Sequence, residues 1–144
     1  MREPCWKFAH AVDCGVPRAF AWAYWTNVGN WHDPPARFEL DGPFAVGTRL
    51  TTVLPDQRLH SMIREAEAGV GALIEMEVLG AVVEFRWRFE EAGEQRTRIT
   101  QTVSMSGEGA EALLGQAKIF EANLPHGMSK MSWAMERRWE GEKD

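Results

Sequence analysis

The sequence predicts an α+β fold in which a curved antiparallel sheet wraps around one long C-terminal helix. Three observations predict it: a strand and a short aromatic helix come first, strand patterns run from about 37 to 105, and one amphipathic helix spans about 108–139. A sheet must have its apolar face covered, and no second long helix is available. We therefore expect the sheet to curve around the last helix and to leave a hollow of the kind that binds small apolar ligands.

The first strand and the first helix are predicted from residues 6–13 and 17–26. Apolar and polar side chains alternate over 6–13, which is typical of a strand buried on one side. Pro17 favours the first turn of the following helix, whose side chains are apolar on nearly all sides. Residues 27–31 add one more turn, and Pro34 and Pro35 end the helical region.

The middle of the chain reads as a series of strands separated by short turns. The expected strands cover about 37–41, 47–54, 59–66, 72–79, 81–90 and 95–105. Turns this short join antiparallel neighbours, so we predict a meander. Alternation is clearest in 81–90, where we expect Phe85, Trp87 and Phe89 to be buried toward the last helix, with Arg86 and Arg88 more exposed.

The final helix is predicted from apolar residues at spacings of three and four. These residues are Leu113, Ala117, Phe120, Leu124, Met128, Met131 and Met135. Pro125 lies inside the pattern with Gly127 nearby, which predicts a kink because proline removes one helical hydrogen bond.

Length and charge limit the classes of partner. A chain of 144 residues fits a single domain over 1–144. The net charge of −5 argues against nucleic acid and anionic membranes as main partners. No segment is long and apolar enough for membrane insertion, and the N-terminus has no signal core. Cys5 and Cys14 lie on opposite faces of a regular strand, so no disulfide is expected and a cytoplasmic location is predicted.

Several segments together resemble a known superfamily. They are Ala21–Trp31, Asp41–Thr48, Phe85–Glu90 and Thr97–Gln101. The order of elements and these segments are similar to those of the START-like (SRPBCC) helix-grip superfamily, which contains polyketide cyclases and birch-pollen-allergen-like proteins. The resemblance implies a seven-stranded antiparallel sheet gripping the C-terminal helix around a hydrophobic cavity. It also implies binding of lipids, hormones or polyketides, cyclisation of polyketides, or assistance to chaperones, without universal catalytic residues.

The four histidines are scattered and lack the spacing of metal ligands. His10 lies on the apolar face of the first strand, as a core histidine or as a group that points into the cavity. His32 follows Trp31 at the mouth of the expected hollow, as a loop cap or as a general acid or base.

Other polar groups divide between the two faces of the sheet. Glu75 and Glu77 oppose the apolar face, so cross-strand ion pairs with Arg86 and Arg88 explain them better than acid–base chemistry. Thr97 and Gln101 share the inward face with apolar neighbours. Polar groups that face a cavity need a hydrogen-bond partner, either protein or ligand, so these two are candidates for orienting a ligand.

The resulting prediction is a carrier of a small hydrophobic molecule, with no metal or cofactor; a homodimer is left open. The predicted ligand-binding residues lie on inward faces or at the mouth: Trp31, His32, Phe38, Trp87, Ile99, Gln101, Phe120, Leu124, Met128 and Met131. One alternative is a polyketide cyclase or dehydratase in which His32, His10 or Gln101 assists proton transfer. A second is a chaperone-interacting module that uses its outer surface. No catalytic residue is assigned.

Overall fold

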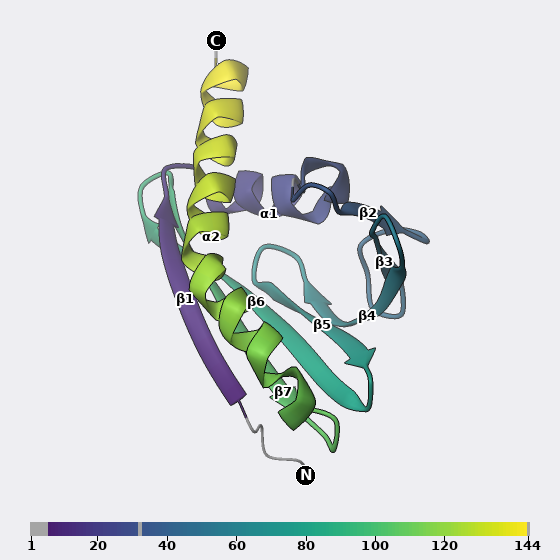
Figure 1. The fold of residues 1–144 in the computed structure, drawn as a ribbon. Helices are drawn as coiled ribbons and strands as arrows, with labels where there is room; N and C mark the ends of the chain where they lie inside the picture. Colours follow the sequence, from purple (N-terminus) through teal and green to yellow (C-terminus); the bar gives the residue numbers. More distant parts are fainter. Residues whose placement is uncertain (1–5, 32, 144) are drawn as a thin grey trace.

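One antiparallel sheet and one long helix make up most of the computed structural model, which describes residues 6–31 and 33–143 (Figure 1). The strands are β1 (Trp6–Cys14), β2 (Arg37–Leu40), β3 (Arg49–Val53), β4 (Arg58–Glu67), β5 (Gly71–Val78), β6 (Ala81–Gly93) and β7 (Arg96–Ser106). The helices are α1 (Arg18–Thr26) and α2 (Leu114–Lys143), with short 3₁₀ turns η1 (Val28–Asn30) and η2 (Glu111–Leu113).

The sheet has seven strands in the order β1-β7-β6-β5-β4-β3-β2, and every neighbouring pair is antiparallel. Strands β2 to β7 form the predicted meander, because each pairs with the next along the chain. The first strand joins the opposite edge by pairing with the last. The predicted fold class is therefore confirmed.

The register places the apolar members of each strand on one face. Phe89 pairs with Ile99 and Trp87 pairs with Gln101, so these side chains share the face that is turned toward α2. Arg86 and Arg88 are exposed and Phe89 is buried, as predicted. Phe85 and Trp87, however, are only half-buried, because α2 packs mainly on β1 rather than over the middle of the sheet.

Helix α2 begins at Leu114, later than predicted, because the chain before it is held against the β5–β6 turn. The backbone N–H of Gly109 donates to the carbonyl of Gly80 at 3.2 Å. A side chain at Gly109 would collide with the carbonyl oxygen of Leu79. The close approach of the two loops therefore requires glycine at this position, and the helix starts after it.

The C-terminal half of α2 is anchored where β1 turns into α1. Glu136 accepts a 2.7 Å hydrogen bond from the backbone N–H of Gly15. The rings of Phe20 and Trp139 meet with centroids 5.0 Å apart. Pro125 lies inside the helix, and the helix bends in this part of its length (Figure 1), which agrees with the predicted kink.

Replacing Thr97 by valine is expected to lower the free energy of unfolding by about 1–3 kcal/mol. Thr97 is fully buried and its hydroxyl donates to the carbonyl of Val16 at 2.8 Å, so valine keeps the shape but leaves that carbonyl without its donor. Urea denaturation measures the change. Thr100→Val is the control, because Thr100 pairs with Ala11 on the outward face of the same strand. Equal losses in the two variants would contradict the assigned bond.

Candidate ligand-binding site

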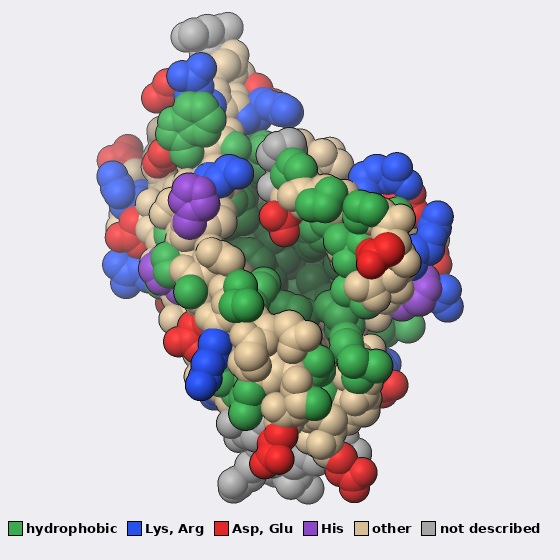
Figure 2. Space-filling model, viewed as in Figure 1, with side chains coloured by type: hydrophobic (Ala, Val, Ile, Leu, Met, Phe, Trp, Pro, Cys, Tyr) green, Lys and Arg blue, Asp and Glu red, His purple; other side chains and the backbone are tan. Residues whose placement is uncertain are grey.

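A hollow opens between α2 and the β2–β4 end of the sheet (Figure 2), and the side chains visible inside it are nearly all hydrophobic. Its existence follows from the placement of the helix. Because α2 packs on β1 and touches α1, the helices cover only part of the inward face of the central strands. Phe38, Phe85 and Trp87 face inward and remain only half-buried.

An aromatic wall runs along one side of the hollow, from the sheet to the mouth. Trp25 of α1 is its centre, with 1% of its surface exposed. The ring centroid of Trp25 lies 4.9 Å from that of Trp87 and 5.7 Å from that of Trp31. Trp31 in turn meets Phe38 at 5.2 Å. The indole N–H of Trp31 donates to the carbonyl of Trp25 at 2.6 Å, which fixes the ring at the mouth.

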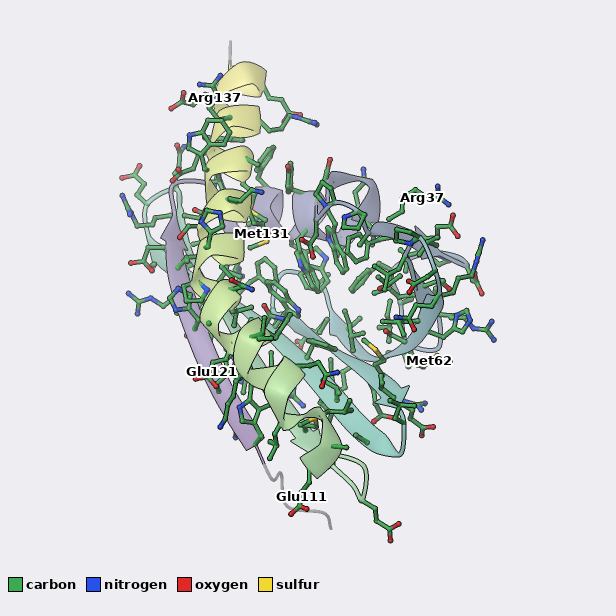
Figure 3. The ribbon with its side chains drawn as sticks, in the orientation of Figure 1. Arg37, Met62, Glu111, Glu121, Met131 and Arg137 are labelled. Atoms are coloured by element: carbon green, nitrogen blue, oxygen red, sulfur yellow. The ribbon has the colours of Figure 1, made fainter. Side chains whose placement is uncertain are left out.

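The helix supplies the opposite wall. Leu124 and Met128 are buried, and Met131 projects from α2 toward the space beside α1 (Figure 3). Phe120 is 40% exposed and its ring meets those of Phe8 and Phe85, with centroid distances of 5.9 and 6.1 Å. The flexible methionine side chains suit a surface that adapts to its ligand.

Two inward polar residues that look alike in the sequence differ in the structure. The hydroxyl of Thr97 is already bonded to the carbonyl of Val16, so its predicted role in orienting a ligand is wrong. Gln101 is buried on the same face, between Trp87 on β6 and His10 on β1. It makes no side-chain hydrogen bond with another residue of the described chain.

The groups considered for catalysis are dispersed or already bonded. Burial raises the pKa of the Cys14 thiol, which lowers its thiolate fraction and its nucleophilicity. His60 is exposed and hydrogen-bonds Thr51 at 3.1 Å. Within residues 6–31 and 33–143, no group of three or more His, Cys, Asp and Glu side chains is placed to hold a metal.

The outer face carries ion pairs, although not all of the predicted ones. Glu75 pairs with Arg64 of β4 at 3.3 Å, and Arg86 pairs with Glu65 at 3.2 Å. The predicted cross-strand ion pair of Glu75 is therefore confirmed, but its partner is Arg64 rather than Arg86 or Arg88. In the register Glu75 lies opposite Met62 on β4, two residues from Arg64, and opposite Glu84 on β6. A depression around Arg49, His60 and Glu75 lies on this face, where Arg49 pairs with Asp41 and Glu75 pairs with Arg64.

The described residues of the predicted site come from α2, from the inward face of the sheet and from the segment after α1. Ile99, Gln101, Leu124 and Met128 are buried, whereas the other described ones are half-buried or, for Phe120, exposed. His32 lies outside the described residues. Their role in ligand binding stays a prediction. Trp25 and Phe44 meet in the aromatic cluster but were not among the predicted site residues; the available signal for Trp25 was the helix that is apolar on all sides. Phe85 was predicted to face inward from the alternation of 81–90 but was not assigned to the site.

Comparison with solved structures identifies the architecture. Norcoclaurine synthase from Thalictrum flavum, in complex with dopamine and hydroxybenzaldehyde, is 13% identical with a TM-score of 0.67, over 88% of this chain and 83% of that one. The chain has the helix-grip fold. A hypothetical protein from Helicobacter pylori shares this fold at 16% identity and a TM-score of 0.71, over 93% and 89% of the two chains. A polyketide-cyclase-like protein from Corynebacterium glutamicum is 16% identical with a TM-score of 0.61, and the match covers 96% of this chain and 93% of that one.

These likenesses concern the helix-grip fold alone, since fold does not determine function. No protein-family model and no curated protein matches the sequence. None of the described helices is long and apolar enough to cross a membrane.

Proposed function

We propose that this chain binds a small, mostly hydrophobic molecule in the hollow between the sheet and α2. The observation that carries the proposal is the set of inward aromatic side chains, Phe38, Phe85 and Trp87, that remain only half-buried. Apolar surface gains free energy when it leaves water, so a ligand that covers these rings is stabilised. The bound small aromatic molecules in the norcoclaurine synthase complex support this proposal by analogy of fold.

An enzyme of the polyketide cyclase or dehydratase type is the second candidate. The names of the similar structures favour it, because they include a synthase and a polyketide-cyclase-like protein. Such a reaction needs a positioned acid or base. His10 is an inward-facing titratable group on β1 that could fill that role. The cytoplasmic location stays a prediction of the sequence.

Titration with the neutral apolar dye N-phenylnaphthylamine tests the binding function. We expect saturable binding with energy transfer from tryptophan to the dye. Trp87→Ala should lower the affinity roughly tenfold, because about 1.4 kcal/mol of aromatic contact is lost. Trp133→Ala is the matched control, since Trp133 lies on α2 with 62% of its surface exposed.

Absence of saturable binding to the wild-type protein would refute the proposed function. Equal losses in the two tryptophan variants would instead place the dye outside the hollow. Circular dichroism of both variants confirms that they remain folded.

A further inference from the structure

The inward face of the sheet is uncharged. Its polar members are neutral side chains and one histidine: His10, Thr52, Ser61, Thr97 and Gln101. The carboxylates and guanidinium groups of the strands lie on outward positions. Glu91, at the far end of β6, occupies an inward position in the register. Its side chain is 73% exposed, however, and its carboxylate lies 3.9 Å from the guanidinium group of Arg18.

An uncharged hollow disfavours charged ligands. A carboxylate or an ammonium group loses its hydration on entering, and this loss costs several kcal/mol unless an opposite charge replaces the water. No Lys or Arg among the described strands points inward to pair with a carboxylate. Fatty acids and other organic anions are therefore poor candidates for burial in this hollow.

Gln101 gives the hollow one directional feature. Only 4% of its surface is exposed, and its amide makes no hydrogen bond with another described side chain or backbone group. No side-chain nitrogen or oxygen of the described residues is both fully enclosed and without a partner, which is consistent with an amide that keeps access to the hollow. A glutamine amide offers both a donor and an acceptor, and buried polar groups of this kind require a partner.

The surroundings of Gln101 indicate the shape of that partner. In the register, Trp87 lies directly beside it on β6 and His10 directly beside it on β1. Trp87 belongs to the aromatic wall with Trp25 and Trp31. Flat aromatic molecules stack on such rings in offset or edge-to-face geometries.

From these observations we propose that the ligand is an uncharged aromatic molecule whose hydroxyl or carbonyl group hydrogen-bonds the amide of Gln101. This inference rests on the proposed binding function and specifies its ligand class. Gln101 acts as the specificity-determining residue, since it pairs with the polar group while the aromatic wall holds the ring.

Three probes with one skeleton test the inference: naphthalene, neutral naphthol and anionic naphthoate. Isothermal titration at about pH 8 keeps the naphthol neutral and the naphthoate anionic. We expect naphthol to bind about 3- to 10-fold more tightly than naphthalene, as for one hydrogen bond. Naphthoate should bind at least roughly 10-fold more weakly than naphthol because its charge is desolvated.

The variant Gln101→Leu should abolish the preference for naphthol and leave naphthalene binding within about twofold, because one hydrogen bond is lost and apolar contact is kept. Gln116→Leu is the matched control, since Gln116 is exposed on α2; it should retain the preference.

Two further results would overturn the inference. One is tighter binding of naphthoate than of naphthol, and the other is an unchanged preference for naphthol in Gln101→Leu. Either result contradicts the inference, whereas saturable binding of the dye would still support the proposed function. If neither the dye nor any of the three probes binds, the proposed function fails together with the inference.

Discussion

Trp25→Ala is expected to lower the free energy of unfolding by about 3–5 kcal/mol, the range for removing a large aromatic side chain from a packed core. Trp25 is 1% exposed. Its ring lies between the sheet and the mouth of the hollow, with centroids 5.0 Å from Phe44 and 5.4 Å from Phe89. Phe89 is held by β6 and Phe44 by the segment between β2 and β3, so these rings cannot move to fill the space of an indole.

Urea denaturation followed by circular dichroism measures this loss, and Trp133→Ala provides the control. Trp133 carries the same ring on the exposed side of α2, where it stacks under Arg137 at 5.2 Å. An exposed cation–π contact contributes about 0.5–1 kcal/mol, so the control should lose no more than that. A small effect at Trp25 would mean that the aromatic wall is not packed as described, and the hollow would lose its rigid side.

The sheet could be predicted because its signals are local. Alternation in residues 81–90 assigns each side chain to a face, and the short turns before and after leave only antiparallel pairing. The structure confirms this register directly, with Phe89 opposite Ile99 and Trp87 opposite Gln101.

The position of α2 over the sheet could not be predicted in the same way. The three-and-four spacing identifies the apolar stripe of the helix, but it does not say which strands the stripe covers. That choice decides which inward residues are buried. Phe89 is buried because Trp22 and Trp25 of α1 pack on it, whereas Trp87, two residues earlier on the same face, is only half-buried.

The polar residues of the site show the same limit of prediction from sequence, because the strand pattern gives the face of a side chain but not its tertiary contacts. Thr97 and Gln101 have identical facing in the strand pattern, and only the tertiary contact of Thr97 with the carbonyl of Val16 separates them. Trp25 was not predicted as a site residue for a related reason. A helix that is apolar on all sides has no preferred face, so its pattern cannot show which ring meets the sheet.

Met135→Ala is expected to lower the free energy of unfolding by about 2–5 kcal/mol. Met135 is fully buried among the core residues at the start of α1. It lies on α2 between Ser132, whose carbonyl accepts from the Cys14 thiol at 3.5 Å, and Trp139, which meets Phe20. Removing its side chain leaves a cavity at the point where the helix is anchored to the rest of the fold.

Ile119→Ala on the same helix is the matched control, because Ile119 is 64% exposed. Alanine is the better helix former, so this substitution should be neutral or slightly stabilising. Urea denaturation compares the two variants, and dye titration of each folded protein adds a second measurement. If Met135 anchors α2 as described, its variant should lose stability while the affinity for the dye changes by less than about threefold, since the neighbouring α2 residues Ser132 and Trp139 contact Cys14 and Phe20. Equal stability losses at Met135 and Ile119 would contradict the assigned face of the helix, and with it the position of the wall that α2 contributes to the hollow.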